Sequence, residues 1–178
     1  AGCGKTAVVM GKLRSLPDDY KYAVANVNYF THAASLQKIL EAPLEKKAGK
    51  NYGPPGNKKL IYFIDDLNMA ALDKYNTASN ISLMRQHMGY GHIFDLNKLT
   101  QRVLLNTQYV GAMNPTAGSF TINPRLQRLF ATFAVNFPSA ESLNTIYTTF
   151  LDGHLKTFAS DVADLSKKVV QARATRQQ

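Results

Sequence analysis

The sequence lacks several features that would place it in large classes of protein. It has a single cysteine, Cys3, so no disulfide can form within the chain, and it has no tryptophan. No apolar run reaches the roughly 20 residues of a membrane-spanning helix, and no basic segment followed by an apolar one opens the chain. These absences exclude a disulfide-stapled scaffold, favour a reducing intracellular setting and predict no membrane partner.

Negative charge is scarce, with 12 acidic residues against 21 lysines and arginines and a formal net charge of +9. Such an excess can indicate a nucleic-acid partner. Many of the lysines, however, lie in one stretch rich in glycine and proline, without interleaved aromatic and basic residues. They are Lys46, Lys47, Lys50, Lys58 and Lys59. We therefore interpret this stretch as a solvated loop and predict no nucleic-acid partner.

The chain does have the composition of a globular domain, with 178 residues of which 45% are hydrophobic and 19% charged. Segments typical of strands alternate with helical segments up to residue 137, which predicts an α/β fold with a parallel sheet and flanking helices. After Pro138 the pattern is helical only. We expect an α/β subdomain over residues 1–137 and the start of an all-helical subdomain over residues 138–178.

Apolar patterning also predicts the individual elements. Strands are expected at Tyr22–Phe30, Leu60–Ile64, Tyr109–Met113 and Thr132–Phe137. Helical spacing predicts helices after "GKT", over 31–41 with Thr31 as its cap, around Ile81–Met88, over 123–130, over 143–151 and over 155–169. The stretch 41–59 is expected to be an exposed loop that contains a hairpin.

The chain opens with "AGCGKT", and a glycine, a lysine and a hydroxyl in this order are typical of the end of a phosphate-binding loop. The full pattern, G-x-x-x-x-G-K-[ST], would place its first glycine before the first residue, so we interpret the sequence as a piece cut inside its own nucleotide site. The backbone of Gly2, Cys3 and Gly4 would face the phosphates. Lys5 would reach the β- and γ-phosphates, and Thr6 would ligate Mg²⁺. A chance loop-to-helix turn is the alternative.

A second motif, "LIYFIDD", is an apolar strand that ends in two acids, the form known as Walker B. Asp65 would hold Mg²⁺ or its water, and Asp66 would orient or deprotonate the attacking water. Paired acids can also be a solvated strand end or a helix cap. The phosphate loop some sixty residues upstream, with a helix, a strand and a helix between, favours the nucleotide-binding interpretation.

Three further side chains are candidates. Asn114 follows the strand in "YVGAMN", where it can reach the γ-phosphate or the attacking water, although an Asn-Pro pair is commonly only a turn. Arg125 and Arg128 lie in "NPRLQRLF" and are candidates to act in trans on nucleotide of a neighbouring module, Arg125 being the preferred one. The alternative for each arginine is a solvated basic face.

The order of these motifs resembles that of AAA+ ATPases, a family of P-loop NTPases. The stretches "NVNYFTHAASLQKILE", "IYFIDDLNM", "SLMRQHMGYGH" and "QYVGAMNPTAGSFTINPRLQRLFATFAVNFP" are similar to the third AAA+ module of a dynein heavy chain, and to axonemal more than cytoplasmic forms. The resemblance covers most of residues 1–152. Most relatives carry Glu where this chain has Asp66, which is one methylene shorter.

This resemblance implies an AAA+ large subdomain, truncated at its N-terminus, followed by an incomplete helical lid. It implies ATP and Mg²⁺ as ligands and a regulatory ATP site within a minus-end-directed microtubule motor of cilia or flagella. The implied partners are neighbouring AAA+ modules of the same heavy chain, microtubules through the rest of the motor, and dynein intermediate and light chains. The implied location is the cytoplasm, in the cytoskeleton of the axoneme.

Two alternatives stay open from the sequence. One is another AAA+ remodelling ATPase, for which the lysine-rich loop would be the element that contacts a substrate. The other is a structural ring module that retains nucleotide without hydrolysing it, which the shorter side chain of Asp66 favours.

Overall fold

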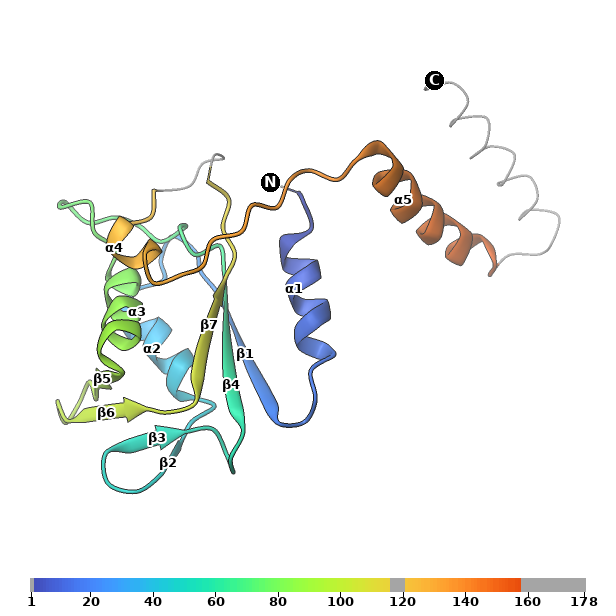
Figure 1. Ribbon diagram of the computed structural model, residues 1–178. Coiled ribbons are helices and arrows are strands. Elements are labelled where there is room, and N and C mark those ends of the chain that lie inside the picture. Colours follow the sequence, from blue (N-terminus) through green and yellow to red (C-terminus); the bar gives the residue numbers. More distant parts are fainter. Residues whose placement is uncertain (1, 116–120, 158–178) are drawn as a thin grey trace. The chain divides into compact units, whose positions relative to one another are not determined.

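The computed structural model describes residues 2–115 and 121–157 and divides the chain into two compact units, Ala1–Ala134 and Val135–Gln178 (Figure 1). The first unit holds both sheets, β1 to β7, and the helices α1 to α4. In the second unit the described helix is α5 (Ala140–Leu155), which confirms the amphipathic helix predicted over 143–151. No helix in the described ranges is long and apolar enough to cross a membrane.

The central sheet of the first unit is parallel, with strand order β1-β4-β7. Its strands are β1 (Tyr20–Asn26), β4 (Lys59–Asp65) and β7 (Thr107–Gly111). The middle strand β4 is buried on both faces, because Leu60, Tyr62 and Ile64 pack into one core cluster and Ile61 and Phe63 into another. A continuous apolar run is what a strand with two covered faces requires, and the predicted parallel α/β fold is confirmed.

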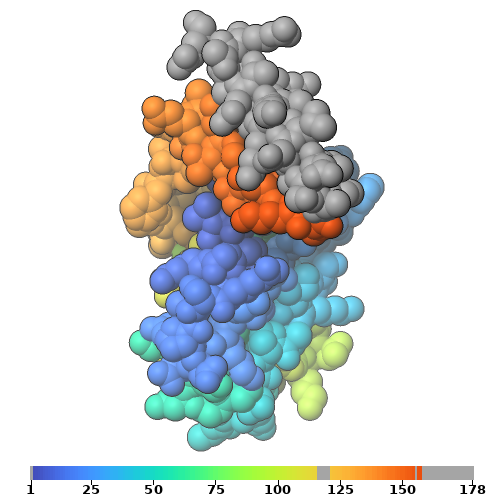
Figure 2. Space-filling model, turned by 90° about the vertical axis from the view of Figure 1, so that its right-hand side faces the viewer, coloured from blue at the N-terminus to red at the C-terminus, as the bar shows by residue number. Residues whose placement is uncertain are grey.

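Helices cover both faces of this sheet (Figure 1). α1 (Lys5–Arg14) packs its buried Leu13 with Ile61 and Phe63, and Figure 2 shows this helix, in blue, at the surface of the unit. α2 (Ala33–Glu41) and α3 (Ser79–Tyr90) cover the other face and contribute the fully buried side chains of Leu36, Leu40 and Met84. α4 (Pro124–Gln127) is one short turn beside α3.

A second sheet has the strand order β2-β3-β6-β5. It lies near the N-terminal ends of the central strands β1, β4 and β7 (Figure 1). Its strands are β2 (Glu45–Lys46), β3 (Asn51–Gly53), β5 (His92–Phe94) and β6 (Gln101–Leu104). β2 and β3 form an antiparallel pair inside the stretch 41–59, which confirms the predicted hairpin. β6 leads directly into β7, so this sheet is joined to the central one.

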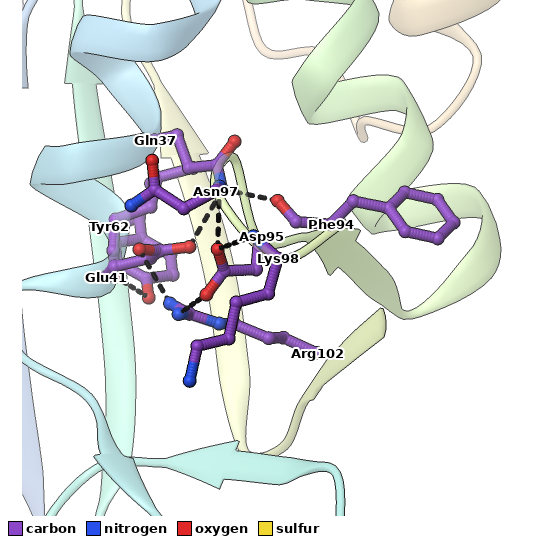
Figure 3. Close-up of polar contacts among 9 residues, drawn as sticks. Gln37, Glu41, Tyr62, Phe94, Asp95, Asn97, Lys98 and Arg102 are labelled. Carbon is purple, nitrogen blue, oxygen red and sulfur yellow. Dashed lines mark hydrogen bonds and ion pairs between the residues drawn. The ribbon is translucent and has the colours of Figure 1, made fainter. Parts of the chain in front are cut away.

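One arginine ties this second sheet to α2 (Figure 3). The guanidinium of Arg102 pairs with Glu41 at 2.8 Å and with Asp95, and it lies over the ring of Tyr52 at 5.0 Å from the centroid. Gln37 donates to Glu41 at 2.8 Å and to the carbonyl oxygen of Phe94 at 2.6 Å. Three separate elements are thereby held in one polar network, which we call the Arg102 network.

Three predictions of local structure are wrong. β1 ends at Asn26 and not at Phe30, because the Asn28 side chain accepts from the Phe30 N–H and turns the chain. Thr31 is not the helix cap, since its hydroxyl accepts from the Asn28 N–H and the cap position is His32.

The third wrong prediction is the strand over 132–137. These residues have no regular structure, and none of the described strands pairs with them. Phe133 is 84% exposed and Phe137 64% exposed, because an isolated extended segment buries neither of its faces. The helix predicted over 155–169 lies almost entirely outside the described residues.

Candidate nucleotide-binding site

The glycines before α1 give the loop an anion-binding shape. Gly2 and Gly4 both have φ of +75°, a left-handed conformation that other residues seldom adopt, and a Cβ at either would meet nothing within 4 Å. Gly4 caps α1 without any side-chain hydrogen bond, and the first turn has no acidic residue. The helix N-terminus is therefore open toward a negative ligand, with the half-buried Cys3 and Lys5 beside it.

The loop and the end of the central strand meet at one contact. The hydroxyl of Thr6 donates to the Asp65 carboxylate at 2.8 Å, although the two residues are 59 positions apart in sequence. Asp65 is the last residue of β4, and its side chain is half-buried. The predicted metal-facing hydroxyl and carboxylate therefore lie next to each other.

Asp66 follows in a sharp turn at the end of the strand. Its φ is +52°, its backbone N–H donates to Asp65 at 3.1 Å, and its carbonyl oxygen accepts from Met69 at 2.9 Å. The side chain is exposed, and in the described part of the chain its carboxylate accepts no hydrogen bond. The turn therefore presents an exposed carboxylate to which residues 2–115 and 121–157 donate no hydrogen bond.

The backbone of Asn114 is held by Asn68, a residue that was not among the predicted site residues. Asn68 is 4% exposed, and its side-chain amide donates to the backbone carbonyl of Asn114 at 3.0 Å. Gly111 leaves room for the neighbouring Leu67, because a Cβ there would meet the Leu67 side chain at 3.3 Å. An asparagine two positions after the paired acids was the available signal. The two turns that follow β4 and β7 are thus fixed to each other.

Of the two candidate arginines, Arg125 lies on α4 and Arg128 caps its C-terminal end. Asn123 accepts from the Arg125 N–H at 2.9 Å and caps the helix, while Leu126 is fully buried beneath it. Arg125 and Arg128 are both exposed and line one open pocket next to α3. In the described part of the chain neither arginine forms an ion pair.

A family model described as the P-loop containing dynein motor region matches residues 1–138. The chain belongs to the dynein motor region family. The dynein alpha chain of the flagellar outer arm of Chlamydomonas reinhardtii is 60% identical over 173 residues, 97% of this chain. Human dynein axonemal heavy chain 9 is 58% identical over 158 residues, or 88%, and the ciliary dynein beta chain of Tripneustes gratilla is 50% identical over 185 residues, or 97% of this chain.

The chain spans 4% of the length of each of these dyneins. The match confirms the resemblance to axonemal dynein heavy chains and the P-loop fold. Among the described residues no three His, Cys, Asp or Glu side chains cluster as a metal cage. The pair of hard oxygen donors on Thr6 and Asp65 nevertheless fits Mg²⁺, which proteins commonly hold through one or two side chains together with water and phosphate oxygens.

Proposed function

We propose that this dynein motor region is the third AAA+ module of an axonemal heavy chain and that it binds Mg-ATP at a regulatory site. The observation that carries the Mg-ATP site is the 2.8 Å hydrogen bond between Thr6 and Asp65, because it joins two motifs that are far apart in sequence. The module number and the regulatory role rest on the resemblance of the sequence alone. The left-handed glycines of the loop support it independently.

The chain's own residues have distinct roles in this proposal. N–H groups of the loop and Lys5 bind the phosphates, and Thr6 and Asp65 hold the metal, which when bound neutralises charge on the phosphate oxygens. Asp66 orients or deprotonates the attacking water. Asn114 contacts the γ-phosphate or that water, and Asn68 fixes the turn that carries it.

The wider setting is also part of the proposal. The module belongs to a ring of AAA+ modules in a minus-end-directed motor that moves along microtubules in cilia or flagella. Microtubule contact comes from other parts of the heavy chain, and intermediate and light chains complete the complex in the axoneme. Arg125, with Arg128 as the second candidate, acts in trans on nucleotide held by the preceding module.

The test is Lys5→Ala in the full-length heavy chain, with Lys12→Ala as a matched control. Lys12 is an exposed lysine in the last turn of the same helix. We expect Lys5→Ala to remove one bound nucleotide per motor and to slow release from microtubules, and Lys12→Ala to change neither. Equal nucleotide content in the parent and both variants would contradict the proposal.

A second candidate function is a module that retains nucleotide without hydrolysing it. The exposed, short carboxylate of Asp66 favours it, because an aspartate reaches less far toward a water than a glutamate does. Asp66→Glu separates the two. If the module only retains nucleotide because of this short side chain, the variant will gain turnover at this site; a module that already hydrolyses ATP will change little.

A further inference from the structure

A third arginine faces the same pocket as Arg125 and Arg128. The pocket lies between α3 and α4 and has a volume of about 370 Å³. It is lined by Arg85, Gly89 and Tyr90 of α3 and by Arg125, Arg128 and Leu129 from α4 and the turn after it. Arg85 is half-buried, whereas the two arginines of α4 are exposed.

The packing of both helices fixes the direction in which these arginines point. α3 buries Ile81, Met84 and His87 against the core, and the half-buried Arg85 lies at the edge of this face, one turn after Ile81. α4 is anchored by the fully buried Leu126 and by the Asn123 cap. The backbone segments that carry the three arginines are therefore held by the core, and all three residues line the one pocket.

No acidic side chain among the described residues pairs with the positive charge in this pocket. Arg102, in contrast, pairs with both Glu41 and Asp95, whereas Arg85, Arg125 and Arg128 form no ion pair in the described ranges. Guanidinium groups stay charged at every physiological pH, so three in one pocket repel each other unless an anion joins them. A planar guanidinium group can donate two parallel hydrogen bonds to two phosphate oxygens. A polyphosphate is therefore the ligand that matches three guanidinium groups in charge and geometry.

We propose that Arg85 binds, together with Arg125 and Arg128, the phosphate groups of the nucleotide held by the preceding module. This inference rests on the proposed function, because it takes the α4 arginines to act in trans, and it adds a residue from a different helix. Two arginines on one short turn approach a phosphate chain from one side only. Arg85 supplies donors from the facing helix, so the pocket holds the chain from two sides.

The experiment uses the full-length heavy chain with Arg85→Gln and, as a matched control, Arg14→Gln. Arg14 is an exposed arginine at the end of α1, outside the pocket. Release of a fluorescent ATP analogue is followed after mixing with excess ATP. The phase that belongs to the preceding module is the one that disappears when the phosphate-loop lysine of that module is replaced by alanine.

We expect Arg85→Gln to accelerate this phase about tenfold or more, as for loss of a hydrogen bond to a charged group, and Arg14→Gln to leave it unchanged. Arg85→Lys keeps the charge without the fork and should recover part of the retention. A merely structural role for Arg85 would show no such graded recovery and would also disturb nucleotide release at other modules.

Two further outcomes would overturn the inference. If Arg85→Gln releases nucleotide no faster than Arg14→Gln does, Arg85 does not contact the phosphates. The second outcome concerns a motor whose preceding module is empty. If Arg85→Gln weakens the binding of free inorganic phosphate there as much as it weakens nucleotide retention in the loaded motor, the pocket is a phosphate site independent of that nucleotide. Failure of the proposed function is distinguishable, because it would appear as unchanged nucleotide content in Lys5→Ala, whatever the result at Arg85.

Discussion

The two ends of the central sheet use similar polar residues in opposite ways. At the end where the strands finish, Asp66 has an exposed carboxylate with no protein donor in the described residues. At the other end, Asp95 also follows a strand directly, but its carboxylate accepts from the N–H groups of Asn97 and Lys98 at 2.8 and 2.9 Å and pairs with Arg102. The first carboxylate is available to a ligand, and the second is part of the fold.

The electrostatics follow the same division. The backbone N–H groups of Lys98 and Asn97, with Arg102 beside them, lower the pKa of Asp95 because they stabilise its charged form. Non-glycine backbone with positive φ occurs at both ends, at Asp66 where the central strands finish and at Leu99 and Asn106 at the other end. We infer that substitutions at the site end change binding and those at the other end change stability, and each prediction below tests that separation.

The largest expected effect is on nucleotide affinity at the site end. Asp65→Ala removes the carboxylate that Thr6 contacts and should weaken Mg-dependent nucleotide binding at this module about 100-fold or more. Asp66→Asn keeps the shape of its side chain and should leave affinity unchanged while it lowers turnover. Equilibrium binding in the full-length motor, with and without Mg²⁺, measures the first effect, and single-module turnover measures the second.

The separate roles of the two acids would be contradicted if both substitutions weakened binding equally. A loss of affinity in Asp65→Ala that is the same with and without Mg²⁺ would show that Asp65 is not a metal ligand. Thr6→Val serves as the matched partner, because it removes the hydroxyl of the same contact and should reproduce the Mg²⁺-dependent loss.

The next effect is on stability at the opposite end. Arg102→Met leaves Glu41 and Asp95 as two carboxylates without their shared partner, in a site where the Asp95 side chain is 10% exposed and the Glu41 side chain 27%. We expect the free energy of unfolding to fall, because the two carboxylates then repel each other without a cation between them. Urea denaturation of the chain measures the loss.

A triple variant provides the control for this prediction. Adding Glu41→Gln and Asp95→Asn to Arg102→Met removes the unpaired charges and should recover part of the stability. Nucleotide affinity in the full-length motor should stay at the parent value in both variants. A marked loss of affinity in Arg102→Met at temperatures where it is folded would break the separation between the two ends.

The site end was largely predictable from sequence, for a physical reason. A phosphate loop and a strand ending in acids are local patterns, because glycine conformation and apolar runs act over a few residues. The parallel sheet then places strand ends together, so Thr6 and Asp65 meet. Neither Asn68 nor Arg85 was singled out, since the hydrogen bond of Asn68 and the pocket lined by Arg85 both involve residues from another element.

The Arg102 network was not predictable in the same way. Its charged members come from α2, from β6 and from the turn that follows β5, and no local spacing relates them. The predicted strand over 132–137 failed for a related reason. Its alternating pattern is strong, but a strand also needs neighbouring N–H and C=O groups, and the described strands provide none. The prediction that Thr31 caps a helix failed because its hydroxyl instead accepts a hydrogen bond in the turn at Asn28.

A smaller effect is the pH dependence of the free energy of unfolding that arises from His87. His87 is 4% exposed, its Nδ1 lies 2.6 Å from the Tyr109 hydroxyl, and burial, with His92 as a lesser cause, lowers its pKa to about 4. Between pH 6.5 and pH 4 the unfolded chain therefore binds the proton more readily than the folded chain. Stability should be constant above pH 6.5 and should fall by about 2 kcal/mol between pH 7 and pH 5.

His87→Gln tests this prediction, because glutamine can contact Tyr109 but does not titrate in this range. The variant is expected to lose stability at pH 7 and to show a flatter dependence on pH between 7 and 5, measured by urea denaturation at each pH. If parent and variant lose stability in parallel as the pH falls, the dependence comes from groups other than His87. Mg-nucleotide affinity in the full-length motor at pH 7 should be unchanged.

The smallest expected effect is on backbone strain at Asp66. At φ +52°, an alanine would be disfavoured by about 1 kcal/mol, whereas asparagine tolerates this conformation as aspartate does. Glycine removes the strain but increases the entropy of the unfolded chain, so Asp66→Gly should be as stable as the parent or slightly more stable. All three variants lack the carboxylate and should lose turnover alike. Urea denaturation alongside turnover measurements ranks them. An order of stability in which alanine equals glycine would show that the turn relaxes, and that the strain at the site end is not part of how this carboxylate is presented.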